Sequence, residues 1–165
     1  MWPANRMSLS ASLPTVVLPY PQPTDAAVSK RMQQNRRRDS RPEMALRSEL
    51  HRRGLRFRVD HPVRAGGRLV RPDIVFTRAR ISVFVDGCFW HCCPEHGSKP
   101  RANTDYWGPK LARNVARDHV VDAALNDAGW VVIRAWEHEL APAVADRVER
   151  VYRQALHALG RSRCG

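Results

Sequence analysis

A cysteine- and histidine-rich loop near the middle of the chain carries the side chains best suited to binding a metal ion. Cys88, Cys93 and His96 lie within nine residues, and two thiolates with one imidazole suit a tetrahedral zinc ion that needs a fourth ligand. His138 can supply that ligand if the strand before it lies beside the strand before the loop. Buried free thiols and a histidine that only packs are the alternatives, and Cys92 is a substitute ligand. The spacing favours a structural zinc site.

Two acidic residues stand at the ends of apolar strand patterns that precede this loop. Asp73 opens the run Ile74–Phe76, and Asp86 follows Val85 at the end of another run. In a two-strand nuclease arrangement, such strand ends offer Mg²⁺ one carboxylate and either a second carboxylate or a backbone carbonyl. The ion then holds the scissile phosphate and activates water. A Pro–Asp pair is also common in turns, and the second strand end twelve residues later strengthens the magnesium interpretation.

His91 and Glu43 are candidates for moving and orienting a proton. His91 lies in the cysteine-rich loop, and a histidine near a metal site can act as a general base because imidazole titrates near working pH. The alternative is that His91 is a further zinc ligand. Glu43 stands three residues after Ser40, as in a helix capping box. It can orient His91 or the attacking water only if that helix start faces the same end of the sheet.

The net charge makes a nucleic acid the expected partner. The chain has 28 Lys and Arg against 16 Asp and Glu, a formal net charge of +12, and such an excess favours binding to a polyanion. The basic run containing Arg36 and Arg37 can lie along phosphates, or it can be a solvated arm. Lys110 and Asn114 are four residues apart, so from one helix face they can contact a phosphate or a base edge.

Two aromatic pairs are compatible with DNA binding. Phe89–Trp90 and Tyr106–Trp107 lie on predicted loops beside polar and glycine residues. Such residues usually belong to a core, but in a basic protein aromatic side chains can also act as wedges between base pairs. The residue pattern leaves both roles open.

The predicted elements describe a small α/β domain. Residues 1–28 are rich in proline, serine and alanine without periodicity, which predicts a disordered extension. Ser40 and Gly54 bound the first helix, and Pro142 opens the last one. The pattern between them predicts strands at 55–59, 71–76, 80–86 and 130–136 and a helix at 110–128. This order, αβββαβα, predicts a sheet with helices packed on it.

Cysteine usage and hydropathy indicate where the chain acts. Four cysteines are too few for a disulfide scaffold, and their crowding with histidines indicates a reducing compartment. No apolar run reaches the roughly 20 residues that cross a bilayer. Pro14 interrupts the only candidate signal-peptide core. We therefore expect neither a membrane segment nor a signal peptide.

From about residue 29 to residue 140 the chain resembles the very-short-patch repair (Vsr) endonucleases. The motifs that carry the similarity are RPEMALR at 41–47, RPDIVF at 71–76, VFVDGCFWH at 83–91, NTDYW at 103–107, RNVARD at 113–118 and the stretch 130–140. The GCFWH run is the most specific of them. The resemblance implies a restriction-endonuclease-like fold with a central mixed sheet flanked by helices, in a domain spanning 29–160 with a flexible tail at 161–165.

The resemblance also implies an activity, cofactors and partners. The family nicks one DNA strand 5′ of the T in T:G mismatches that arise when 5-methylcytosine deaminates, with catalytic Mg²⁺ and structural Zn²⁺. The fourth zinc ligand would be His138, where the family often has Cys, and zinc accepts either. Expected partners are double-stranded DNA with a T:G mismatch, mismatch-repair proteins and a DNA cytosine methyltransferase. A monomer acting in the bacterial cytoplasm is expected.

Carried over residue by residue, the resemblance assigns catalytic roles to candidates already named. Asp73 matches the metal-binding aspartate, and Val85 matches the position that gives its backbone carbonyl to Mg²⁺. His91 matches the catalytic histidine, and Glu43 matches the acidic residue that supports it. Position 86 is Asp where the enterobacterial-type enzyme has His, so Asp86 is either a second metal carboxylate or a supporting group.

The DNA-contacting residues are carried over in the same way. Phe89, Trp90 and Trp107 match the wedge aromatics, and Lys110 and Asn114 match residues near the mismatch. We therefore predict a zinc-stabilised, Mg²⁺-dependent mismatch nickase. The alternatives are a zinc-dependent DNA-binding module with an inactive nuclease site and a restriction-type nuclease that cuts matched duplex.

Overall fold

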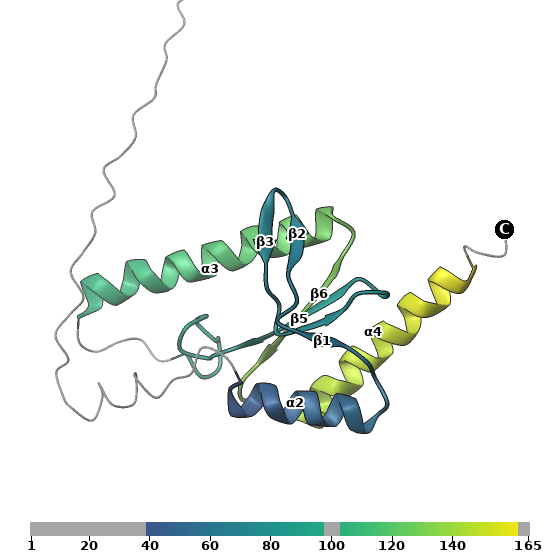
Figure 1. Cartoon of the computed structure of the whole chain (residues 1–165). Helices are drawn as coiled ribbons and strands as arrows, with labels where there is room; N and C mark the ends of the chain where they lie inside the picture. The colour runs from purple at the N-terminus through teal and green to yellow at the C-terminus, as the bar shows by residue number, and fades with distance from the viewer. Residues whose placement is uncertain (1–38, 98–102, 162–165) are drawn as a thin grey trace, which may run out of the picture.

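The computed structural model of the chain describes residues 39–97 and 103–161 (Figure 1). The predicted extension at 1–28, the residues Arg36 and Arg37, and positions 162–165 of the predicted tail lie outside these ranges. The elements, in chain order, are α2 (Arg41–Arg52), β1 (Arg58–Val59), β2 (Val63–Ala65), β3 (Arg68–Val70), β4 (Ile74–Phe76), β5 (Ile81–Asp86), α3 (Thr104–Asp127), β6 (Val131–Trp136) and α4 (Ala141–Arg161).

Four of the strands form one mixed sheet in the order β1–β4–β5–β6. β4 is antiparallel to both β1 and β5, whereas β5 and β6 are parallel. Val83 of β5 lies opposite Ile74 of β4 and Ile133 of β6. As a result β5 and β6 end at the edge where β4 begins, and we call this edge the carboxyl end of the sheet. The prediction of a mixed α/β sheet flanked by helices is confirmed.

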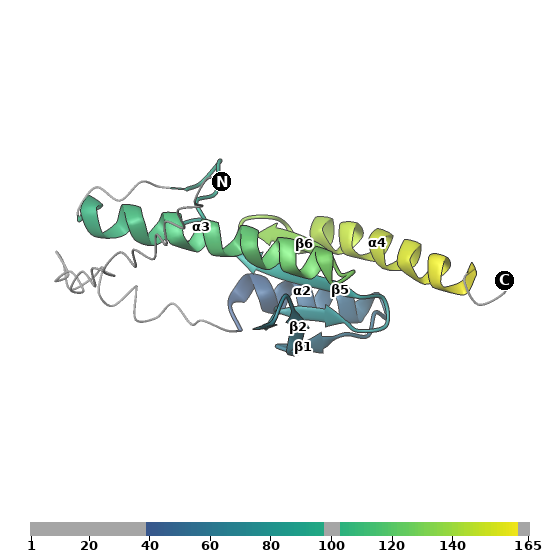
Figure 2. The same ribbon diagram turned by 90° about the horizontal axis from the view of Figure 1, so that it is seen from above.

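Helices cover both faces of this sheet, as the two perpendicular views show (Figures 1 and 2). α2 and α4 pack on one face, where Leu50, Ile81 and Val148 are fully buried. α3 and the β2–β3 hairpin pack on the other face around Val75 and Leu125, which are also fully buried. Burying apolar side chains on both faces fixes the sheet between the two layers.

The predicted capping box at the start of α2 is present, in a modified form. The Ser40 side chain accepts a hydrogen bond from the Glu43 N–H at 3.4 Å. Glu43 in turn accepts from the Asp39 N–H at 3.0 Å and from the Ser40 hydroxyl at 2.9 Å. These bonds satisfy donors that a helix start leaves without partners. They also place Glu43 firmly at one end of the helix, where it is buried.

Two predicted elements have clearly different bounds in the structure. α3 begins at Thr104 rather than at residue 110 and contains Pro109, so Tyr106 and Trp107 lie on a helix and not on a loop. Pro109 lacks the N–H that a helix interior uses, and two residues before it the buried Trp107 packs on Phe89 and Trp90. The predicted strand at 55–59 shortens to β1, and its Arg58 projects outward as the alternation predicted.

The β2–β3 hairpin was not predicted, because the sequence there suggested only a loop. Its strands are three residues each, and they pair Val63 with Val70 across a tight turn. Gly66 and Gly67 have φ angles of +53° and +72°, which a two-residue primed turn requires at both central positions. In the described part of the chain no helix is long and apolar enough to cross a membrane.

Candidate active site and metal centre

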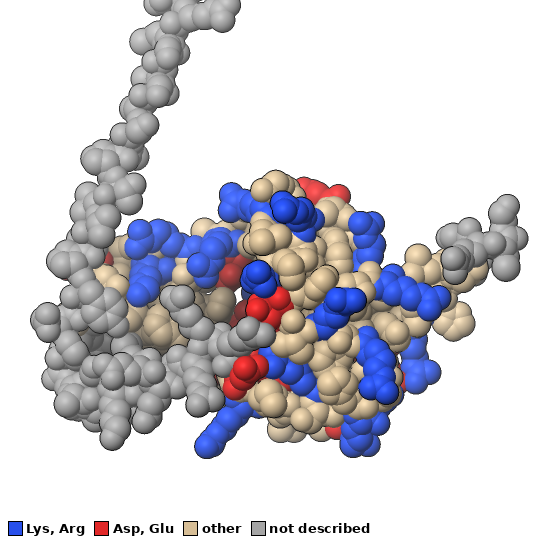
Figure 3. Space-filling view, in the orientation of Figure 1, with Lys and Arg blue, Asp and Glu red and all other residues tan. Residues whose placement is uncertain are grey.

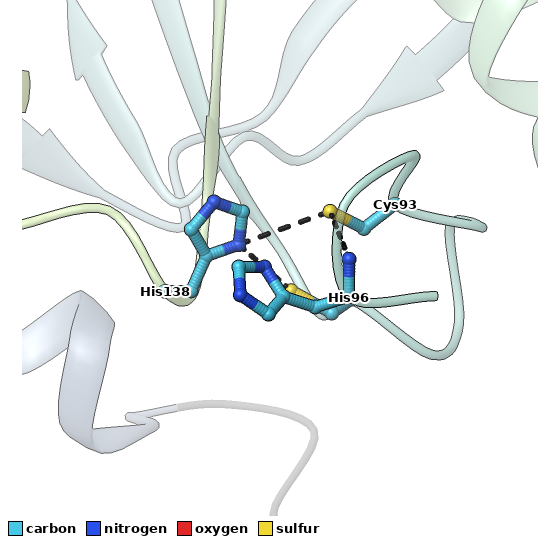
Figure 4. Close-up of side chains that lie close together, drawn as sticks. Cys93, His96 and His138 are labelled. Atoms are coloured by element: carbon cyan, nitrogen blue, oxygen red, sulfur yellow. Dashed lines mark hydrogen bonds between the residues drawn. The ribbon is translucent and has the colours of Figure 1, made fainter. Parts of the chain in front are cut away.

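The predicted metal ligands converge at the carboxyl end of the sheet. One ligand atom from each of Cys88, Cys93, His96 and His138 lies within 4.8 Å of the other three. The His138 Nδ1 atom is 3.1 Å from the Cys88 Sγ and 3.8 Å from the Cys93 Sγ. Figure 4 shows the side chains of Cys93, His96 and His138 turned toward one another. Two thiols and two imidazoles at this spacing can hold a metal ion.

The surroundings of this cluster also suit a cation. Burial, together with the adjacent Cys93, raises the pKa of the Cys88 thiol to about 11. A bound cation would reverse that shift, because metal ligation stabilises thiolates. Glu95 Oε2 lies 3.6 Å from the His138 Nε2 atom, on the opposite side of the ring from the thiols. Cys92 is exposed and does not belong to the group of ligand atoms.

Asp73 lies against the end of β5, where it contacts Val85, twelve residues later in the sequence. Its Oδ2 atom accepts a hydrogen bond from the Val85 N–H at 2.8 Å. Burial, together with the charges of Glu43 and Asp86, raises the pKa of the Asp73 carboxyl to about 6, against the hydrogen bond from Val85 and the charge of Arg47. A half-buried carboxyl whose pKa stays raised beside two other acidic groups, despite the nearby Arg47, is in a position that suits a cation.

His91 is held between two aspartates at the same end of the sheet. Its Nδ1 atom lies 2.5 Å from Asp118 Oδ2 on α3 and 3.7 Å from Asp86 Oδ1 on β5. The ring is partly exposed, whereas the Asp86 side chain is nearly fully buried. Contact between Nδ1 and a carboxylate fixes the orientation of an imidazole and leaves its Nε2 atom able to accept or donate a proton.

Arg134 on β6 gathers the carboxylates around His91. Its Nη1 atom donates to both oxygens of Asp86 at 2.9 Å, and its Nε and Nη2 atoms donate to Asp122 at 2.9–3.1 Å. Asp118 Oδ1 lies 3.6 Å from Nη2. The carboxylates raise the pKa of Arg134 above its ordinary range against the effect of burial. Both oxygens of Asp86 are therefore engaged by one guanidinium nitrogen.

Glu43 does not contact His91 within the described residues. Its carboxylate accepts from Arg47 Nη2 at 2.9 Å, and both side chains are buried. Its influence on the site is electrostatic, through the pKa of Asp73. The condition set from the sequence, that the start of α2 must face the carboxyl end of the sheet, is met with respect to Asp73.

The predicted wedge aromatics form one cluster beside the metal centre. The ring centroids of Phe89 and Trp90 lie 5.1 Å apart, and each lies 5.6–5.8 Å from that of Trp107. Lys110 Nζ lies 5.0 Å from the Trp107 ring and 5.9 Å from the Trp90 ring. Asn114 donates to the Trp90 backbone carbonyl at 3.3 Å. Both polar residues of α3 thus hold the aromatic cluster as well as face outward.

The sequence reasoning missed three residues of the site: Asp118, Asp122 and Arg134. A signal for two of them existed, because Asp118 and Asp122 continue the four-residue spacing of Lys110 and Asn114 along one face of α3. Arg134 had no such signal. It lies in a strand whose neighbouring positions are apolar, and only the pairing of β5 with β6 brings it beside Asp86.

Comparisons with known proteins agree with this arrangement. A family model described as DNA mismatch endonuclease Vsr matches residues 23–95. The chain is 53% identical to the type II nicking enzyme V.NaeI of Lentzea aerocolonigenes over 135 residues, which cover 81% of each protein. It is 45% identical to the type II nicking enzyme V.XorIIP of Xanthomonas oryzae over 114 residues, covering 67% of this chain and 79% of that protein.

One further relative carries the same name as the family model. Over 113 residues the chain is 37% identical to the DNA mismatch endonuclease Vsr of Escherichia coli K12, covering 68% of this chain and 70% of that protein. The shared length includes most of a folded domain, and the family's nuclease character agrees with the carboxylates and histidine at the carboxyl end of the sheet. The chain therefore belongs to the Vsr family of DNA endonucleases.

Proposed function

We propose that this endonuclease nicks one DNA strand on the 5′ side of the T in a T:G mismatch, with catalytic Mg²⁺ and structural Zn²⁺ on a restriction-endonuclease-like fold. The observation that carries the proposal is a convergence. A half-buried carboxylate, an aspartate-held histidine and an aromatic cluster lie together at the carboxyl end of one sheet. We propose further that it acts as a monomer in the bacterial cytoplasm. Mismatch-repair proteins and a DNA cytosine methyltransferase are its predicted protein partners.

Asp73 and the Val85 backbone carbonyl would hold the magnesium ion. Within the described residues the one hydrogen bond to the Asp73 carboxylate uses Oδ2, so Oδ1 is available to a cation. Hard oxygen ligands are those that Mg²⁺ prefers. When bound, the ion would supply positive charge against the charge that develops on the scissile phosphate. Glu43 would support this site through Arg47 and through its own charge rather than through His91.

His91 would handle the proton of the attacking water. With Nδ1 directed at Asp118, the ring presents Nε2 as the atom that accepts a proton. Asp86 and Asp118 stabilise the imidazolium that results, because each carries negative charge close to Nδ1. Asp86 fits the supporting role better than the metal-binding role, since Arg134 already engages both of its oxygens.

Cys88, Cys93, His96 and His138 would bind zinc, which accepts tetrahedral sulfur and nitrogen ligands. The site has no chemical step to perform. Its effect is to join the loop that carries His91 to the end of β6, so that the histidine and the aromatic cluster keep their positions relative to the sheet.

Phe89 and Trp90, which are partly exposed, would open the base stack at the mismatch, and the buried Trp107 would support both rings. Inserting an aromatic side chain between base pairs costs a few kcal/mol per unstacked step, and a weak wobble pair lowers that cost. Lys110 and Asn114 lie on the α3 face beside the cluster, where they can meet DNA that the wedge has opened. This selects a mismatch with little direct reading of bases.

The test is nicking of end-labelled duplexes by the purified protein with Mg²⁺. One duplex carries a single T:G pair in varied flanks, and the control is its T:A match. A single cut 5′ of the T in the mismatch alone is expected, and the Asp73→Asn variant should bind the same DNA without cutting it. Cuts in both duplexes would instead indicate a restriction-type nuclease. Tight binding without any cut would indicate an inactive DNA-binding module.

A further inference from the structure

The β2–β3 hairpin is a two-sided ribbon with one face packed and one face outward. Val63, Ala65 and Val70 are buried against α3. Gly66 at the turn approaches α3 so closely that an added Cβ would lie 3.0 Å from the Ala124 Cβ. The packed face therefore fixes the ribbon on α3, and the opposite face is held in a defined position without contacting the protein core.

The outward face is basic and carries one exposed apolar side chain. Arg64 is exposed, and Leu69, directly opposite it in the hairpin register, is 54% exposed. Arg68 is also exposed, but it lies opposite the buried Ala65, at the turn end of the packed face. From residue 61 to residue 71 the chain has three arginines and no acidic residue. Among residues 39–97 and 103–161, neither the Arg64 nor the Arg68 guanidinium forms an ion pair or a side-chain hydrogen bond.

Several other arginines of the described chain are engaged by the protein itself. Arg47, Arg53, Arg134 and Arg153 each form an ion pair with an acidic side chain of the protein itself. An arginine without an internal acidic partner, on a rigid element, is the kind that serves an external anion. Figure 3 shows basic side chains over the hairpin, with acidic side chains lower on the same face toward its middle.

The second strand of the ribbon ends close to the candidate active site. β3 ends at Val70, three residues before Asp73, and three residues of extended chain span at most about 10 Å. One turn of duplex DNA is about 34 Å long. The base of the ribbon is therefore close enough to Asp73 for one duplex to contact both within a few base pairs.

We propose that the outward face of the β2–β3 hairpin enters the major groove of the duplex that flanks the cleaved step and sets a preference for particular flanking base pairs. The major groove admits a two-stranded ribbon, an arginine fork reads guanine there, and an apolar side chain contacts the thymine methyl group. Phosphate contact alone would require the arginines but not the exposed Leu69. This inference rests on the proposed action on duplex DNA.

The experiment selects flanking sequence rather than measuring one substrate. A T:G duplex library with randomised flanking base pairs is bound by the protein without Mg²⁺, and the bound fraction is sequenced; a parallel arm with Mg²⁺ sequences the nicked fraction. The variants are Arg64→Ala, Arg64→Lys and Leu69→Ala, and the matched control is Arg153→Ala, an equally exposed arginine on α4. Thermal melting verifies that each variant is folded.

The wild type should prefer certain base pairs at a contiguous flanking position, and Arg64→Ala should reduce that preference by roughly 5- to 100-fold, the discrimination of one bidentate contact. Arg64→Lys keeps the charge but not the fork, so it should lose the preference and retain most of the affinity. Arg153→Ala should keep both. Binding loss that is uniform across all flanks, or no flanking preference in the wild type, would overturn the inference.

The binding arm separates this inference from the proposed function. If the wild type binds selectively but does not nick, the nickase proposal fails while the ribbon inference stands. If the wild type nicks T:G duplexes and the Arg64 variants keep its flanking preference, the ribbon inference fails alone. A protein that neither binds nor nicks duplex DNA would overturn both.

Discussion

The ionised form of Asp73 destabilises the folded protein but is the form that a cation would bind. Its pKa of about 6 in the folded protein exceeds the value of 3.8 for an unperturbed aspartate. Between these two values the folded state retains a proton that the unfolded state has released, so the free energy of unfolding falls as pH rises through this window. Near neutral pH the ionised carboxylate is a cost to the metal-free protein, and a bound cation removes that cost.

This cost predicts that Asp73→Asn stabilises the protein while abolishing nicking. In magnesium-free buffer near neutral pH, the free energy of unfolding should rise by roughly 1–3 kcal/mol, which corresponds to the removed pKa shift. Urea unfolding measures it, without chelator, because a chelator would also strip the cysteine–histidine site. Asp127→Asn, exposed at the end of α3, is the control and should change stability by less than about 0.5 kcal/mol. A variant no more stable than the wild type contradicts the prediction.

The same pKa predicts how the magnesium requirement changes with pH. Magnesium binds the ionised carboxylate, so below pH 6 or so protons compete with it, and the Mg²⁺ concentration for half-maximal nicking should rise about tenfold per pH unit. Above that pH the requirement should be nearly constant. Single-turnover nicking across a magnesium titration at each pH measures this, and a requirement that is flat across pH 6 would remove Asp73 from the magnesium site.

Arg134 is a positioning residue in our interpretation, since it reaches His91 only through Asp86 and Asp118. Arg134→Met should lower the single-turnover nicking rate roughly tenfold or more and leave the affinity for DNA within about threefold. It should also cost roughly 2 kcal/mol of stability, because Asp86 is left buried without its partner. Adding Asp86→Asn to that variant should recover part of the stability.

The matched control for Arg134→Met is Arg147→Met, because Arg147 is also partly buried and donates to the Arg134 carbonyl at 2.9 Å without touching the aspartates. It should lose stability and keep the nicking rate. Equal losses of nicking rate in the two variants would contradict the positioning role and show that Arg134 contributes only to stability.

At the scale of elements, the hairpin and α3 depend on each other through one close approach. Gly66 and Gly67 both have positive φ angles. A Cβ added at Gly66 would lie 3.0 Å from the Ala124 Cβ of α3, whereas a Cβ added at Gly67 would meet no atom within 4 Å. Both substitutions to alanine carry the conformational cost of a positive φ. The difference between them isolates the contact with Ala124.

We therefore expect Gly66→Ala to destabilise the protein by roughly 1 kcal/mol more than Gly67→Ala does. Thermal or urea unfolding of the two variants and the wild type measures the difference. Equal losses would show that the turn conformation alone matters and that the ribbon does not rest on α3 as closely as the contact distance indicates.

At the scale of the whole molecule, the cysteine–histidine cluster is the longest-range connection of the site. It joins Cys88 to His138, fifty residues apart in sequence, and so closes the chain around β5, α3 and β6. Connections that close long loops restrict the unfolded chain, and metal-binding free energy at such a site is folding free energy. With a metal ion bound there, the cluster would couple metal content to the stability of the sheet end that carries His91.

The coupling predicts that His138→Ala lowers bound zinc and the melting temperature together, whereas His138→Cys retains both, because zinc accepts either ligand. Atomic absorption of the purified variants and thermal melting measure the two quantities. The exposed His119 on α3 serves as control, and His119→Ala should change neither. Unchanged zinc content in His138→Ala would remove that histidine from the metal site.

The sequence by itself determined the parts of this protein that depend on local spacing. The cap of α2, the strands around Val83 and Ile133, and the clustering of Cys88, Cys93 and His96 all follow from residues near one another in the chain. Motifs of this kind also carry the family resemblance. Local hydrogen bonding and side-chain periodicity act over a few residues, so they can be read without the fold.

Tertiary structure decided what depends on contacts between distant segments. Asp118 meets His91 across 27 residues and Arg134 meets Asp86 across 48, and no local rule pairs those positions. The hairpin also escaped prediction, because strands of three residues become stable only when one face packs on α3. Burial, which raises the pKa of Asp73 and leaves Arg64 outside, is a property of the whole packed molecule and not of any one segment.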